Sequence, residues 1–225
     1  MKQPEMFSSE ELRKAVKRFL VLLLSNSSAY PVENPFAIFM GGQSGAGKTN
    51  LQDVLLTETN NNAIVINGDL YRRFHPRMNE IIELYGIENM PAYTALWAGQ
   101  FVEVLIGMLS RLRYNLIIEG TLRTAEVPLK TAKLLTERGY DVVLAVLAVK
   151  PEISLASCEV RYKRMQSMGT YPRSVEPEVH NAIVRDLVQN LSVLETNSLF
   201  KNTKVYSRSG QLLYSASDNS SSSKL

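Results

Sequence analysis

The sequence is poor in sulfur and imidazole: its 225 residues include one cysteine, Cys158, and two histidines, His75 and His180. A single thiol cannot form an intramolecular disulfide, and it excludes a metal cluster held by several thiolates. Two histidines add too few ligands for an ordinary zinc centre. Scarce cysteine is typical of proteins from a reducing compartment, so we expect a cytoplasmic location.

An excess of one charge is also missing, because 25 Lys and Arg face 22 Asp and Glu and the formal net charge is +3. No run of basic residues forms a tail, so we expect no nucleic-acid partner. The N-terminus shows no apolar signal-peptide core. The mostly apolar stretch 92–109 contains Glu103 and is at the short limit for a bilayer span. A buried helix explains it better, and we expect no membrane partner.

What remains is a globular composition, with 45% hydrophobic and 21% charged residues. A helix is predicted over 10–24, capped by Ser8 or Ser9, and short apolar runs then alternate with helical patterns. Strands are predicted at 36–40, 63–66, 116–118, 142–149, 204–207 and 211–215, and helices at 47–57, 92–111, 125–138, 151–168 and 177–196. This alternation predicts an α/β fold with a doubly wound, mainly parallel sheet. We expect one domain over 1–217, with helix 10–24 packed on it, and a polar, disordered tail over 218–225.

A phosphate-binding loop stands between the first predicted strand and the next helix. The pattern G-x-x-x-x-G-K-[ST] is matched by Gly42, Gln43, Ser44, Gly45, Ala46, Gly47, Lys48 and Thr49. Glycines let backbone N–H groups surround a polyanion, and the helix N-terminus adds its positive end. Lys48 is predicted to lie between the β- and γ-phosphates, and the Thr49 hydroxyl to hold Mg²⁺. The motif makes the expected fold P-loop kinase-like.

Polar side chains follow two further predicted strands. Asp69 ends the second strand, Glu119 and Thr121 end the third, and Arg123 comes next. If the first two strands are neighbours, Asp69 lies beside the phosphate loop, where a carboxylate can accept a proton from an attacking hydroxyl or hold Mg²⁺ through water. The alternatives are a helix cap for Asp69, an arginine ion pair for Glu119 and a solvated position for Arg123.

Three more charged residues are candidates. Glu103 is the lone charge in a predicted apolar helix, so it faces a polar cleft or a cation, or it lies on the solvent side of the helix. Arg161 and Arg173 bracket a segment with glycine and proline, and such arginines can close over nucleotide phosphates and neutralise transition-state charge. A basic helix end that complements the helix dipole is the other interpretation.

The combination of motifs resembles the zeta toxins of bacterial epsilon/zeta toxin–antitoxin systems, the family that includes the PezT proteins. The resemblance rests on four stretches in consistent order: 40–49, 66–76, 117–123 and 161–173. Zeta toxins are P-loop kinases that use ATP and Mg²⁺ to phosphorylate UDP-N-acetylglucosamine on a sugar hydroxyl, which inhibits peptidoglycan synthesis. The resemblance implies this activity for the chain, in a bacterial cytoplasm.

By this resemblance Asp69 is the general base, Lys48 and Thr49 bind ATP and Mg²⁺, and Arg161 and Arg173 clamp phosphates. The substrate side is assigned to Glu119, Thr121 and Arg123 and, by a looser alignment, to Glu103. Members of the family are held inactive by a small helical antitoxin that blocks the ATP site. The resemblance therefore implies a separate antitoxin partner and a UDP-sugar substrate.

Two other functions fit the same motifs. One is another small P-loop kinase that acts on a nucleotide or an antibiotic, and the other is a nucleotide-dependent binding module whose partner reads the bound state. Carboxylates at two strand ends, Asp69 and Glu119, favour catalysis over binding alone. Substrate-dependent release of ADP across UDP-sugars, nucleosides and aminoglycosides separates these alternatives.

Overall fold

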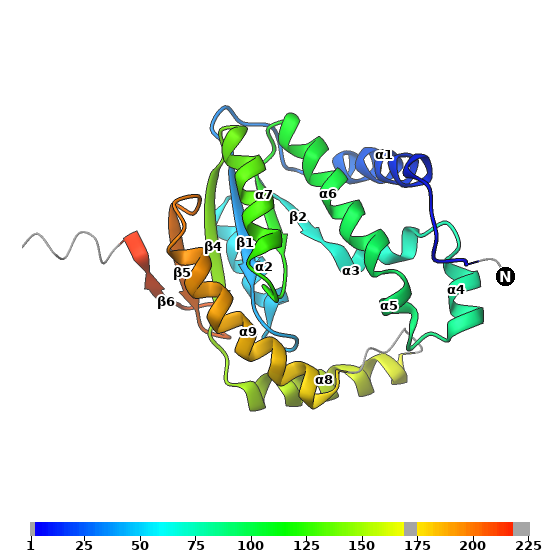
Figure 1. Ribbon diagram of the computed structural model, residues 1–225. Coiled ribbons are helices and arrows are strands. Elements are labelled where there is room, and N and C mark those ends of the chain that lie inside the picture. The colour runs from blue at the N-terminus through cyan, green and yellow to red at the C-terminus, as the bar shows by residue number, and fades with distance from the viewer. Residues whose placement is uncertain (1–2, 169–174, 218–225) are drawn as a thin grey trace, which may run out of the picture.

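A six-stranded sheet forms the centre of the computed structural model, which describes residues 3–168 and 175–217 (Figure 1). The strands lie in the order β2-β3-β1-β4-β5-β6. Their bounds are Phe36–Gly41 (β1), Ile64–Asn67 (β2), Leu116–Glu119 (β3), Asp141–Leu147 (β4), Asn202–Tyr206 (β5) and Leu212–Ser215 (β6). β1 to β5 are parallel and β6 is antiparallel to β5. The predicted doubly wound, mainly parallel fold of the P-loop kinase type is confirmed.

Helices occupy both faces of this sheet. They are α1 (Ser9–Ser25), α2 (Lys48–Glu58), α3 (Gly68–Tyr71), η1 (Arg72–Phe74), α4 (Met78–Tyr85), α5 (Met90–Tyr93), α6 (Ala95–Arg111), α7 (Glu126–Glu137), α8 (Pro151–Ser167) and α9 (Pro177–Glu195). Within the described residues, no helix is long and apolar enough to cross a membrane.

Alternation along the central strand divides the core into two layers. Ala37 and Phe39 of β1 pack with side chains from α1, α6, α7 and α9 on one face. Ile38 and Met40 point the other way and pack with Leu51 of α2. Both faces of β1 are therefore covered, which explains why its sequence is a continuous apolar run.

The N-terminal helix α1 packs against α6 (Figure 1). Its N-terminus has a capping box, in which the Ser8 hydroxyl accepts from the Glu11 N–H and the Glu11 carboxylate accepts from the Ser8 N–H. Arg77, before α4, donates to Glu11 over 2.7 Å from Nη1 to Oε1. That hydrogen bond, together with those to Ser8, lowers the pKa of Glu11 from 4.5 to about 2. These contacts join α1 to the helices that follow β2.

The segment 68–94 differs most from the sequence-based prediction. It contains α3, η1, α4 and α5, none of which was predicted, and the long helix begins at Ala95 instead of residue 92. Each of these helices has eight residues or fewer, too few for an apolar period to stand out, and Pro76 and Pro91 interrupt the pattern. The predicted tail over 218–225 lies outside the described residues.

Candidate active site

The phosphate-binding loop joins the end of β1 to the start of α2, as its sequence predicts. Gly45 and Gly47 have φ values of +77° and +101°, in the left-handed region that favours glycine. A Cβ atom on Gly45 would lie 2.0 Å from the Ser154 carbonyl oxygen and 2.9 Å from Cys158 Sγ. The loop is thus packed directly on α8, and only glycine fits at its closest point.

Polar contacts with three other segments hold the loop in place. Gln43 is 2% exposed, and its Nε2 donates to the Val149 carbonyl over 2.8 Å and to Ser154 Oγ over 3.2 Å. Arg208, in the turn between β5 and β6, donates to the Gly45 carbonyl over 2.8 Å and to Ser157 Oγ over 2.9 Å. The loop conformation is therefore fixed by polar contacts with α8, with the end of β4 and with the β5–β6 turn.

Lys48 lies at the centre of the site. Its Nζ donates to the Gly42 and Gln43 carbonyls over 2.9 and 3.2 Å, and it is 4.0 Å from Glu119 Oε1. Burial lowers the pKa of the Lys48 ammonium and Arg161 lowers it further, whereas Glu119 and Asp69 raise it. Three other predicted site residues therefore interact electrostatically with the Lys48 ammonium group.

The sheet order decides which carboxylate is next to the phosphate loop. Because β3 lies between β1 and β2, the strands that carry the loop and Asp69 are not neighbours. Glu119, at the end of β3, takes the adjacent position and accepts from Asn67 Nδ2 over 2.6 Å. The condition on which sequence analysis placed Asp69 beside the loop is not met, since Asp69 is one strand further away.

Asp69 lies in the first turn of α3, where its N–H donates to the Asn67 side chain over 3.0 Å. Its carboxylate accepts from Arg72 Nε over 2.9 Å, and its side chain is 46% exposed. Asn67 is therefore the N-cap of α3 and also the donor to Glu119. The Asn67 side chain thus links the Glu119 carboxylate to the backbone of Asp69, and the Asp69 side chain remains accessible to an acceptor molecule.

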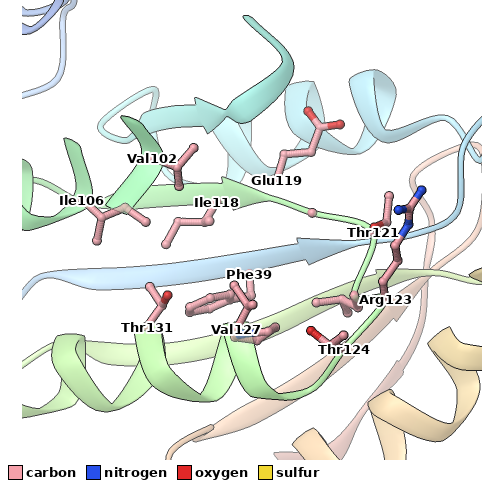
Figure 2. A pocket seen from close by; sticks show the side chains of 13 residues that line it. Phe39, Val102, Ile106, Ile118, Glu119, Thr121, Arg123, Thr124, Val127 and Thr131 are labelled. Atoms are coloured by element: carbon pink, nitrogen blue, oxygen red, sulfur yellow. The ribbon is translucent and has the colours of Figure 1, made fainter. Parts of the chain in front are cut away.

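A cavity of about 260 Å³ opens beside the end of β3. Figure 2 shows Val102 and Ile106 of α6 on one side of it and Val127 of α7 on the other. Glu119 and Arg123 also line this cavity, and their side chains point away from those apolar walls. The remaining lining residues are Phe39, Ile118, Gly120, Thr121, Leu122, Thr124, Pro128 and Thr131. The structure therefore brings Glu119, Thr121 and Arg123 together at one cavity.

The structure places the other predicted site residues differently. Glu103 is 55% exposed and pairs with Lys130 of α7 over 3.1 Å, and it does not line the cavity. Arg161 lines a hollow on α8 together with Arg164 and Arg208. Arg173 lies outside the described residues.

ATP and Mg²⁺ fit the residues that are present. The N-cap of α2 is Gly47, which has no side chain to accept from the first-turn N–H groups, so a phosphate oxygen can take that place. Thr49 is exposed in the first turn of α2, where its hydroxyl can hold Mg²⁺. Within residues 3–168 and 175–217, no three His, Cys, Asp or Glu side chains cluster as metal ligands. A magnesium ion here would take its other ligands from phosphate and water.

Fold and site together define a protein of the P-loop kinase type, with the Glu119 carboxylate beside the phosphate loop. The profile of the zeta toxin family matches residues 23–219. The chain is 39% identical over 217 residues to Toxin PezT of Streptococcus pneumoniae, covering 96% of this chain and 85% of that protein. It is 33% identical to Toxin zeta of Streptococcus pyogenes, covering 93% and 72% of the two chains. The chain therefore belongs to the zeta toxin family.

A solved structure from work on the PezAT chromosomal toxin–antitoxin system of Streptococcus pneumoniae gives the same result. It superposes with a TM-score of 0.86 at 37% sequence identity, and the match covers 98% of this chain and 85% of the other. The family resemblance inferred from the motifs is confirmed.

Sequence analysis missed several residues that shape the site. Arg208 and Ser154 contact the phosphate loop from positions far along the chain, and His180 contacts Ser154. The turn Ser207–Gly210 gives no signal of a role at the loop, because its sequence is that of any polar turn. Only the parallel pairing of β4 with β5 brings this turn to the same edge of the sheet as the phosphate loop.

Proposed function

We propose that this protein is an ATP- and Mg²⁺-dependent kinase that phosphorylates a sugar hydroxyl of UDP-N-acetylglucosamine, or of a related UDP-sugar, and so blocks peptidoglycan synthesis. Membership of the zeta toxin family supports this proposal. The observation that carries the kinase assignment is the 4.0 Å approach of Lys48 Nζ to Glu119 Oε1. This contact joins the phosphate loop to the C-terminal end of the neighbouring strand β3. An acceptor has to meet the γ-phosphate at this edge of the sheet.

Each side chain of the site then has a defined task. ATP supplies the transferred phosphoryl group, and Lys48 and Arg161 stabilise its negative charge during transfer. Asp69 is exposed and takes the proton of the attacking sugar hydroxyl. Glu119 holds Lys48 by charge and, with Arg123 at the cavity, orients the acceptor.

An antitoxin partner belongs to the same proposal. The related PezAT structure comes from a toxin–antitoxin system. We infer that a small helical antitoxin binds this protein and covers its ATP site. Co-expression of a cognate antitoxin should restore growth of cells that produce the kinase, and a complex that leaves ATP binding unchanged would contradict this mode of inhibition.

The test of the substrate is a paired induction in bacteria without an antitoxin. The wild type should stop growth, and mass spectrometry should show a phosphorylated UDP-sugar. Asp69→Asn keeps the shape of the side chain and removes the basic oxygen, so transfer should fall roughly 10²–10⁴-fold while ATP still binds. If no phosphorylated UDP-sugar accumulates with the wild type, the substrate assignment is wrong. If it accumulates equally with Asp69→Asn, the base assignment is wrong.

A further inference from the structure

A buried chain of polar side chains runs from the phosphate loop to α9. Gln43 of the loop donates to Ser154 Oγ of α8 over 3.2 Å, and Ser154 Oγ lies 2.9 Å from His180 Nε2 of α9. Gln43 is 2% exposed, and Ser154 and His180 are both fully buried. Buried polar groups are retained only where their hydrogen bonds are made, so this chain is a specific feature of the interior.

Counting donors and acceptors gives one consistent set of directions for these hydrogen bonds. A serine hydroxyl has one proton to donate and two lone pairs. The Ser154 proton goes to the Pro151 carbonyl of its own helix over 2.9 Å, and Gln43 Nε2 donates to one lone pair. The remaining lone pair faces His180 and can accept from an N–H on Nε2. All three positions on the Ser154 hydroxyl are then filled.

The other imidazole nitrogen agrees with this tautomer. His180 Nδ1 is buried and has no hydrogen-bond partner among the described residues. An unpaired N–H donor would be costly there, whereas a bare lone pair is tolerated better. The proton therefore belongs on Nε2, where Ser154 accepts it.

At its other end, this series of hydrogen-bonded side chains reaches Lys48, the lysine proposed to contact the nucleotide. The Gln43 carbonyl accepts from Lys48 Nζ over 3.2 Å and from the Ala46 N–H over 3.2 Å. The side chain of Gln43 is held by the Val149 carbonyl and by Ser154, so Ser154 helps to set the position of the carbonyl that holds Lys48. A change at His180 releases one bond of Ser154 and loosens this tether.

We propose that His180 is a positioning residue of the nucleotide site, which holds the phosphate loop in its binding conformation through Ser154 and Gln43. This inference rests on the proposed ATP-dependent function, and it assigns a role in nucleotide affinity to a helix that contributes no residue to the loop. His180 touches neither phosphate nor acceptor, so its effect falls on ATP binding more than on the transfer step.

The experiment compares ATP affinity in four proteins, measured with a fluorescent ATP analogue without any acceptor. His180→Leu should raise the Kd for ATP about three- to thirty-fold, which is the effect of losing one buried hydrogen bond. His180→Gln keeps a donor near the Nε2 position and should restore most of the affinity. Leu187→Ala is the matched control, because Leu187 is a buried core residue of the same helix. It should lower the melting temperature and leave the Kd unchanged.

Combining His180→Leu with Ser154→Ala completes the test. Both substitutions act on the same series of hydrogen bonds, so their effects on the Kd for ATP should not add. If His180→Leu changes the melting temperature but not the Kd, or if Leu187→Ala weakens ATP binding equally, His180 is only a core residue and the inference is wrong. If the wild type itself binds no ATP, the proposed function fails instead.

Discussion

The phosphate loop and the segment that carries Asp69 are held in place by different forces. The loop is fixed by hydrogen bonds to particular groups, such as those from Arg208 to the Gly45 carbonyl and from Gln43 to Ser154. Asp69 stands on α3, whose Tyr71 stacks on Phe101 of α6 at 4.7 Å between ring centroids. There an aromatic core supports the helix that carries Asp69, in addition to the hydrogen bonds that Asp69 makes with Asn67 and Arg72.

The difference follows from what the phosphate loop and the segment with Asp69 each have to bind. A phosphate is bound by backbone N–H groups, whose directions have to be right within the narrow geometry of a hydrogen bond, so the loop needs directional contacts. A general base has to reach a hydroxyl that arrives with the substrate. A short, exposed helix that is supported by rigid aromatic packing is sufficient for this. Trp97 also supports this helix, because its Nε1 donates to the Tyr71 carbonyl over 3.0 Å.

The largest expected effect on phosphotransfer comes from a substitution at the centre of the phosphate-binding site, at Lys48. Lys48→Ala removes the ammonium group that meets the phosphates, and phosphotransfer should fall about 10²–10³-fold while the melting temperature stays near that of the wild type. The control is Lys201→Ala, which removes an exposed lysine that pairs with Asp141. Retained turnover in a folded Lys48→Ala protein would contradict the role of the loop.

Removal of Arg161 tests whether α8 takes part in transfer. Arg161→Ala should lower kcat about ten- to a hundred-fold and change the KM for ATP little, if the guanidinium acts on transition-state charge. It should also raise the pKa of Lys48, which Arg161 lowers. Arg185→Ala, on the exposed side of α9, is the control. By the family resemblance, Arg173→Ala should show the same kinetic change as Arg161→Ala.

A smaller effect is expected where the loop is held from the β5–β6 turn. Arg208→Ala loses the bonds to Gly45 and Ser157, and the KM for ATP should rise about three- to tenfold with kcat nearly unchanged. Steady-state kinetics at saturating acceptor measure both constants. Should kcat fall instead, Arg208 acts on the reaction and not on the shape of the loop.

The smallest effect concerns the aromatic support of Asp69 and depends on pH. His75 is buried against Trp97, with 5.0 Å between ring centroids, and burial lowers the pKa of its imidazole below the ordinary value of 6.5. The unfolded chain therefore takes up a proton first, and stability present above pH 6.5 decreases as the pH falls from there towards the folded pKa.

Urea unfolding across this pH range measures the effect. His75→Phe should unfold with a flatter pH dependence, and its ATP affinity at pH above 7 should equal that of the wild type. A pH dependence as steep as that of the wild type would show that other groups cause it. A loss of ATP affinity would show that the phosphate loop and the segment with Asp69 are not held in place independently.

The amino-acid sequence by itself determined the phosphate half of the site. A run such as 36–40 and the motif that ends in Lys48 and Thr49 are local patterns, and local patterns specify local structure. The five parallel strands lie close to their predicted positions for the same reason. The family too followed from motifs that are each contiguous in the chain.

Only the tertiary structure decided how these pieces meet. The order of the strands made Glu119 and not Asp69 the neighbour of the phosphate loop, and the fold brought Glu103 of α6 to Lys130 of α7. The contacts of Arg208 and His180 with the site likewise join residues that no spacing connects. Strand order and helix packing depend on long-range contacts, and the periodicity of a single segment carries no information about its partners.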